Sequence, residues 1–114
     1  MAKIPTEDKS ALFLNAWLFL APSLPVPEAE YNFDKYAGRR HRFDWAFIED
    51  RIGVEVDGGT WLPHGGRHGM DADRVKLNLA SELGWLVFRY STKMLRDDPA
   101  GCVAQVMRAL ENQR

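Results

Sequence analysis

Three acidic residues, Asp44, Glu55 and Asp57, lie on a stretch with the pattern of two strands. Apolar residues alternate with other side chains over 43–47 and again over 52–57, which predicts two strands joined as a hairpin. Asp44 then lies on the arm next to Glu55, and Asp57 shares a face with Glu55. Opposite side chains in such a pair are about 5 Å apart, so the three carboxylates should crowd one region.

Carboxylates held this close repel one another, and burial raises the cost. A hard divalent cation between them answers this repulsion, and Mg²⁺ typically takes one or two carboxylates and keeps several waters. The alternative is that Asp44 and Glu55 face solvent on an open side of the sheet. Apolar neighbours already fill the opposite face, which weakens that alternative. These neighbours are Trp45, Phe47, Val54 and Val56.

Periodicity and capping residues predict the elements that position these acids. A buried helix is expected from its cap at Thr6 to Leu20, followed by a proline-rich extended segment over 22–27 and a strand over 30–36. After the hairpin, residues 58–69 contain five glycines in twelve positions, which predicts a loop able to bring its backbone close to a partner.

Asp71 is expected to cap the next helix, which Gly84 ends. Residues 85–90 are nearly all apolar, which predicts an internal strand reached through a crossover, and Asp98 before a proline predicts a last helix. The expected order is helix, three strands, helix, strand, helix. The fold class is therefore α/β or α+β, a mixed sheet of about four strands flanked by helices, in one domain over 1–114.

The chain has 114 residues, a formal net charge of −1 and 46% hydrophobic residues. This composition fits one folded domain, and the net charge argues against a protein that coats nucleic acid nonspecifically. Basic residues nevertheless flank the acidic hairpin on both sides. They are Arg39, Arg40, His41 and Arg42 before it, and Arg67, His68, Arg74 and Lys76 after it. A site that binds both a metal and a phosphate has this pattern, although a solvated charged turn explains the first run equally well.

The run from Ala11 to Ala21 is strongly apolar, but Asn15 interrupts it and Pro22 ends it. It is shorter than the ~20 residues that a membrane span needs, so no membrane partner is expected. The one cysteine, Cys102, falls in a helical pattern and is expected to be a core residue. These features predict a cytoplasmic protein.

The hairpin resembles that of one nuclease superfamily. Residues 42–47 (RFDWAF) and 52–59 (IGVEVDGG) are similar to the catalytic hairpin of the PD-(D/E)XK nucleases, in particular the small very-short-patch-repair-like endonucleases of phages and bacteria. The resemblance continues through residues 66–68, 73–78 and 84–89, and it covers about residues 24–95.

This resemblance implies a restriction-endonuclease-like fold that hydrolyses DNA phosphodiester bonds by a metal-activated water, in the host cytoplasm if a phage encodes it. It implies that Asp44 and Glu55 bind Mg²⁺, for which Mn²⁺ can substitute, together with the carbonyl of Val56. Glu30 matches the place of an upstream acid that orients water, or is simply an acid at the start of an edge strand. DNA is the implied partner, and a homodimer is required if two symmetric cuts are made.

The sequence departs from the family at one position. The family has a lysine two residues after the glutamate, where this chain has Asp57. An aspartate cannot stabilise negative charge or position water as a lysine does. Two arrangements could compensate for the missing lysine. Asp57 could be a further metal ligand, or Lys76 could supply the missing cation from the following helix. Lys76 is otherwise an ordinary surface residue paired with Asp73 or another acid.

The glycine-rich segment is expected to contact DNA. Arg67 and His68 would reach a phosphate, and Trp61 would stack on a base or ribose, or else anchor the loop to the core. The other predicted DNA contacts are Arg39, Arg40, Arg42 and Arg74. A zinc site at His64 and His68 is disfavoured because Pro63, Gly65 and Gly66 argue against a helix there and no cysteine pair accompanies the histidines.

A second function is compatible with the missing lysine: a noncatalytic module that binds nucleic acid or a protein partner and keeps the nuclease fold. A descendant without activity has no reason to retain Asp44, Glu55 and Asp57 together. The sequence therefore favours the enzyme.

Overall fold

The computed structural model describes residues 8–57 and 66–114, with side chains described for 8–57 and 71–114. Its elements, in chain order, are α1 (Ala11–Leu20), β1 (Glu28–Asn32), the 3-10 turn η1 (Lys35–Ala37), β2 (Arg42–Phe47), β3 (Ile52–Asp57), α2 (Gly66–Glu82), β4 (Leu86–Ser91), α3 (Thr92–Asp97) and α4 (Pro99–Asn112). Within the described parts of the chain, no helix is both long and apolar enough to cross a membrane.

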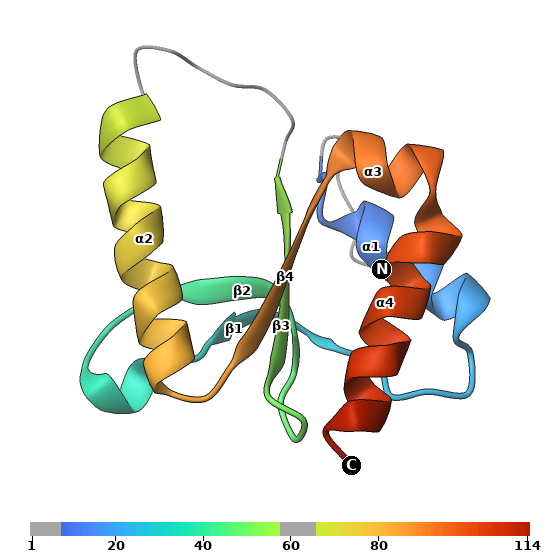
Figure 1. Cartoon of the computed structure of the whole chain (residues 1–114), viewed down its shortest axis with the longest axis horizontal. Coiled ribbons are helices and arrows are strands. Elements are labelled where there is room, and N and C mark those ends of the chain that lie inside the picture. The colour runs from blue at the N-terminus through green and yellow to red at the C-terminus, as the bar shows by residue number, and fades with distance from the viewer. Residues whose placement is uncertain (1–7, 58–65) are drawn as a thin grey trace, which may run out of the picture.

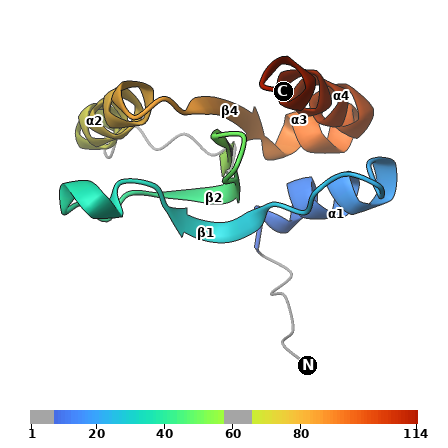
Figure 2. The same cartoon turned by 90° about the horizontal axis from the view of Figure 1, so that it is seen from below.

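The four strands form one mixed sheet in the order β1-β2-β3-β4. β1, β2 and β3 pair antiparallel, whereas β3 and β4 are parallel. Parallel neighbours need a crossover, and α2 lies in the connection between them. Figures 1 and 2 show α2 on one side of the sheet and α1, α3 and α4 on the other. This confirms the expected mixed sheet flanked by helices.

Each side of the sheet has its own apolar core. On the side of α1, α3 and α4, Phe13, Trp17 and Val106 are fully buried. They pack there with residues of the hairpin, namely Trp45, Phe47, Ile52 and Val54. On the α2 side, Phe43 and Ala80 lie in a smaller cluster that also includes Phe33, Ala46 and Trp85. The expectation that Trp45, Phe47 and Val54 fill the face away from the acids is confirmed, as is the burial of Cys102.

α1 is only partly the buried helix that its sequence predicts. Its apolar residues lie all round the helix, but only some of them pack into the core formed with the sheet, α3 and α4. Phe13 and Trp17 are therefore buried while residues 18–20 are exposed, with Phe19 at 83%. The expected cap, Thr6, lies outside the described residues.

Two boundaries near the sheet differ from expectation. β1 spans Glu28–Asn32 and not 30–36, because the chain turns into η1 after it. The buried Asp34 carboxylate holds that turn by accepting from the His41 backbone N–H at 3.0 Å, and it lies 2.7 Å from His41 Nδ1. α2 begins at Gly66, so the expected cap at Asp71 is wrong. The glycines there disfavour a helix by only about 1 kcal/mol each, a weak bias that the helix overrides.

β4 lies at the edge of the sheet and not inside it, so the expectation of an internal strand is wrong. Its apolar character comes instead from helices on both of its faces, since α2 and α3 both contact it. α3 was not expected; Ser91 caps it by accepting from the Met94 N–H at 3.0 Å. The last helix begins as expected, with Asp98 accepting from the Gly101 N–H at 3.0 Å.

Gly53 occupies the point in β3 where a side chain would collide with the smaller core. A Cβ there would lie between 2.6 and 2.8 Å from ring atoms of Phe43. That ring is fully buried and stacks on Phe33 with centroids 4.2 Å apart, so it cannot move freely. We expect Gly53→Ala to lower the free energy of unfolding by about 1–3 kcal/mol, measured by urea denaturation.

The matched control for this substitution combines Gly53→Ala with Phe43→Leu. The smaller leucine leaves space for the new methyl group, so the second change should cost less in the Gly53→Ala background than in the native chain. A Gly53→Ala protein as stable as the native chain would contradict the steric argument.

Candidate active site

Asp44 lies where β2 and β3 separate. Their register runs from Phe47–Ile52 to Trp45–Val54, and beyond it the two strands diverge (Figure 1). Two residues further along β3, the backbone N–H of Val56 donates to Asp44 Oδ2 at 2.7 Å. The carboxylate of Asp44 is thus fixed against the backbone of β3 and takes the place of a strand partner.

The carbonyl of Val56 opens on the same side. In an extended strand, the N–H and C=O of one residue point to the same side, which is why paired residues can exchange both hydrogen bonds. Because the Val56 N–H reaches Asp44, the Val56 carbonyl also faces the gap between β2 and β3. Two oxygen ligands expected from the sequence therefore border one space.

Glu55 is buried on the α2 side of the sheet, with 11% of its side chain exposed. Its Oε1 accepts a hydrogen bond from Nζ of Lys76, which projects from α2 and is itself mostly buried. Its Oε2 is buried and has no hydrogen-bond partner among the described residues. Arg89 Nε lies 3.9 Å from Oε2, which is within ion-pair range but too long for a hydrogen bond.

Burial raises the pKa of Glu55 above its ordinary value. The hydrogen bond and charge of Lys76, and the charge of Arg89, act in the opposite direction without offsetting burial, and the nearby Asp44 adds to the rise. Ionised Glu55 is therefore poorly stabilised by its own protein surroundings. A further positive charge at Oε2 would favour the ionised form.

Arg89 links the site to two more acids. It lies beside Glu55 in the parallel register of β3 and β4. Its Nη2 is 3.2 Å from Asp57 Oδ1, and its Nη1 donates to Asp73 Oδ2 on α2. The site thus has two side-chain cations, Lys76 and Arg89, and four carboxylates. When all six groups are ionised, their formal charge is −2. The carboxylates are those of Asp44, Glu55, Asp57 and Asp73.

The expected gathering of three carboxylates is not complete. No group of three or more His, Cys, Asp or Glu side chains within the described residues could hold a metal ion. Asp57 turns to Arg89, which supplies the countercharge that the sequence analysis assigned to a metal. Asp44, Glu55 and the Val56 carbonyl remain as candidate ligands, and the role of Asp57 stays a prediction.

Glu30 is exposed on the edge strand β1. It lies between the paired residues Ala29–Trp45 and Tyr31–Phe43, which places it across from Asp44. Its φ of 53° is in the left-handed region, which a residue other than glycine seldom adopts. The structure thus brings Glu30 to the strand that carries Asp44, and its proposed role in orienting water stays a prediction.

The described members of the predicted DNA-binding set lie on the side of the molecule that carries α2. Arg39, Arg40 and Arg42 are exposed on the segment that enters β2, at the same end as α2 (Figures 1 and 2). On α2, Arg74 is exposed and pairs with Asp71 at 2.8 Å. The backbone of Arg67 and His68 belongs to α2. Trp61, and the side chains of Arg67 and His68, lie outside the described residues.

Sequence reasoning gave Arg89 no role in the site and named Asp73 only as a possible partner of Lys76. The signal for Arg89 was present, since it is the one charged residue in the otherwise apolar or aromatic run 85–90. Asp73 had a weaker signal, its position three residues before Lys76, which places both on one face of a helix.

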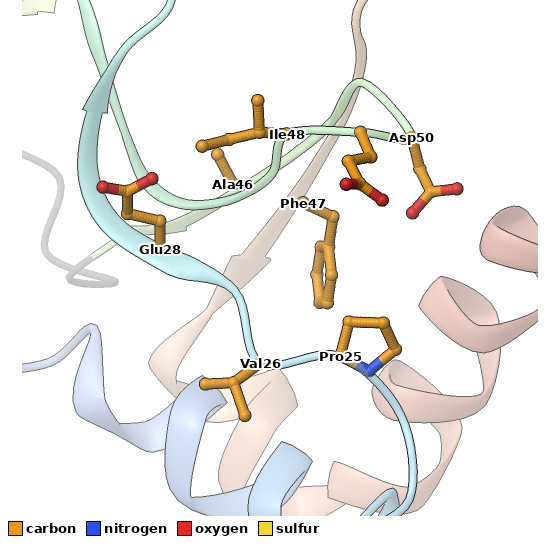
Figure 3. Close-up of a pocket in the computed structure, with 8 residues that line it drawn as sticks. Pro25, Val26, Glu28, Ala46, Phe47, Ile48 and Asp50 are labelled. Carbon is orange, nitrogen blue, oxygen red and sulfur yellow. The ribbon is translucent and has the colours of Figure 1, made fainter.

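A separate pocket of about 310 Å³ lies at the other end of the hairpin, and its lining includes none of the site residues. Figure 3 shows Phe47 pointing toward Pro25 within it. Three acids, Glu28, Glu49 and Asp50, also line it. Asp50 is engaged by Arg114, whose Nε is 3.3 Å away.

Comparison with known proteins gives two distant relatives. No family model matches the chain. The relatives are "Uncharacterized protein MT2308" of Mycobacterium tuberculosis strain CDC 1551 / Oshkosh and "Uncharacterized protein Rv2248" of strain ATCC 25618 / H37Rv. Each is 29% identical over 91 residues, covering 80% of this chain and 33% of the relative. The chain therefore spans about one third of the length of the curated relatives it matches.

Proposed function

We propose that this chain is a Mg²⁺-dependent endonuclease of the PD-(D/E)XK type that hydrolyses DNA phosphodiester bonds. One observation carries the proposal: the buried Glu55 has Lys76 on one oxygen and no hydrogen-bond partner, among the described residues, on the other. An orphaned buried acceptor costs free energy. A divalent cation at Oε2 would remove that cost, and Asp44 borders the same region as a second oxygen ligand.

The donor set suits Mg²⁺ better than a softer metal. Two carboxylates and one backbone carbonyl are hard oxygen ligands, and Mg²⁺ sites of this kind keep several waters. The formal charge of −2 at the site equals the charge that one such ion neutralises. When bound, Mg²⁺ supplies a Lewis acid that polarises the phosphate and lowers the pKa of a water nucleophile.

The side chains around the ligands have separate roles in this proposal. Asp44 is held in place by the Val56 N–H before substrate arrives, which preorganises the site. Lys76 replaces the missing motif lysine and stabilises negative charge that develops on the phosphate. Arg39, Arg40 and Arg42 contact the flanking DNA backbone, which sets position but not sequence preference. Asp57 would become a further metal ligand only if its carboxylate left Arg89 and bound the ion instead.

Nicking of supercoiled plasmid DNA tests the proposal directly. The native chain should nick plasmid with Mg²⁺ or Mn²⁺ and not with excess EDTA, and Asp44→Ala should be inactive under all three conditions. Asp97→Ala is the matched control, because it removes an exposed acid from α3 on the other side of the sheet; it should cleave like the native chain. Equal activity of the native and Asp44→Ala proteins, or none in either, would reject the enzyme.

One observation favours the noncatalytic alternative. Lys76 and Arg89 already pair with the acids that would otherwise bind a metal. A module that only binds DNA would keep such pairs permanently. DNA binding by the native chain that neither needs Mg²⁺ nor leads to cleavage would support this second function.

A further inference from the structure

Arg89 is the one guanidinium among the described residues that joins three elements at the candidate site. It projects from β4, its Nη2 lies 3.2 Å from Asp57 on β3, and its Nη1 donates to Asp73 on α2. About one third of its side chain is exposed. An isolated surface pair of this kind stabilises little, but a guanidinium that binds two carboxylates at once fixes their geometry because its donors form a rigid fork.

The bond to Asp73 bears on the position of Lys76. Residues three apart on a helix lie on the same face, so Asp73 and Lys76 both point from α2 toward the sheet. Asp73 is fastened to Arg89, and Lys76 is fastened to Glu55. Because Glu55 and Arg89 are neighbours in the parallel register, the two ion pairs lie side by side across the same helix-to-sheet contact.

Among the described residues of α2, the apolar contacts lie toward its C-terminal end. Ala80 is buried and Leu79 packs against the smaller core, whereas Val75 is 45% exposed. Lys76 itself lies over the Phe43 ring, with Nζ 5.8 Å from the ring centroid. The ion pair between Asp73 and Arg89 adds a contact on the same face further toward the N-terminal end of α2. Loss of that ion pair should loosen the hold on Lys76.

We propose that Arg89 is a positioning residue, which fixes through Asp73 the face of α2 that carries Lys76 and so holds Lys76 against Glu55. The proposal deepens the proposed function, on which its catalytic consequence rests. Arg89 touches neither the reacting phosphate nor the water in this role. It acts on cleavage only through the placement of Lys76.

Chemical labelling of lysine tests this placement without any cleavage assay. Reductive methylation of the full chain, followed by mass spectrometry, reports how exposed each lysine amine is. Arg89→Gln and Asp73→Asn should each raise the rate at Lys76 by about fivefold to tenfold relative to Lys93, an exposed lysine on α3. Asp71→Asn should leave the Lys76 rate unchanged, because it removes an exposed ion pair within α2 that does not involve Arg89.

Three further comparisons sharpen the test. Arg89→Lys keeps a cation near Asp73 and should recover part of the protection. The double variant Arg89→Gln with Asp73→Asn should be labelled no faster than either single variant, since both remove the same bond. On plasmid DNA, both single variants should cut about tenfold more slowly than the native chain.

The outcomes separate this inference from the proposed function. Unchanged Lys76 labelling in Arg89→Gln and Asp73→Asn would overturn the positioning role, whatever the protein does to DNA. Faster Lys76 labelling in these two variants, together with a native protein that never cuts DNA, would uphold the role and reject the endonuclease. Faster labelling in Asp71→Asn as well would also overturn it, because the effect would then not depend on Arg89.

Discussion

Replacing Glu55 with glutamine is expected to lower DNA cleavage by at least about 1,000-fold, or about 4 kcal/mol of activation free energy, while leaving the protein at least as stable at pH 7.5. The activity is lost because a neutral amide is a poor ligand for Mg²⁺. Glutamine keeps the shape of the side chain and an oxygen that accepts from Lys76. The change therefore removes a charge and not a contact.

The expected gain in stability follows from the raised pKa of Glu55. The folded state holds this proton more tightly than the unfolded chain does, so ionising Glu55 costs folding free energy as the pH rises from its ordinary value of 4.5 through the raised value. The cost is fully present above the folded pKa and absent below the unfolded one. The free energy of unfolding of Glu55→Gln should thus exceed that of the native chain at neutral pH, and the difference should disappear below about pH 4.

Two measurements check this pair of expectations. Single-turnover plasmid cleavage measures the loss of activity, and urea denaturation at pH 7.5 and at pH 4 measures the free energy of unfolding. Cleavage within tenfold of the native rate would show that Glu55 is not a metal ligand. A free energy of unfolding below the native value at pH 7.5 would show that its charge is well accommodated without a metal.

Replacing Lys76 with methionine is expected to slow cleavage by about 100-fold. Methionine keeps the length and apolar stem of the side chain but removes the ammonium that contacts Glu55. The loss should fall on the rate constant at saturating DNA, because Lys76 is assigned to the chemical step and not to binding. The free energy of unfolding should also fall, by about 1–3 kcal/mol, since a buried carboxylate loses its hydrogen bond.

Lys93→Met is the matched control for this substitution. Lys93 is 82% exposed on α3 and pairs only with Asp97 four residues later among its described contacts. Its removal should change neither the cleavage rate nor the stability by a measurable amount. A Lys76→Met protein that cleaves at the native rate would return Lys76 to the role of an ordinary ion-pair partner.

Local sequence patterns predicted the elements whose signals are short in range. The alternation over 52–57 coincides with β3, and Asp98 before a proline marks the start of α4. The position of β4 at the edge was missed because helix cover on two faces gives a strand the same apolar composition as strand neighbours do. The start of α2 was missed because glycine content is a weak bias that tertiary contacts override.

The candidate site divides in the same way. Asp44 and Glu55 could be found because both lie on one hairpin, whose register follows from alternation. Lys76 could be suggested only as a replacement for an absent lysine, and the structure places it on Glu55. Asp73 could not be assigned, because its contact with Arg89 depends on how α2 packs against β4. Arg89 could not be assigned to Glu55, because that depends on which residues of β3 and β4 align. No local pattern fixes a parallel register across a long crossover.

The apolar cores on the two sides of the sheet differ in size. The strands that carry Asp44 and Glu55 and the helix that carries Lys76 should therefore differ in their resistance to local opening. Asp44 and Glu55 lie on strands that pack against the larger core formed with α1, α3 and α4. The Lys76 ammonium lies on α2, where, within residues 71–82, Ala80 is buried in the smaller core and Leu79 packs against it. Lifting α2 therefore costs less than disturbing α4, which buries Cys102, Val103, Val106, Ala109 and Leu110. We therefore expect local opening to separate Lys76 from Glu55 before it displaces Glu55 or Asp44.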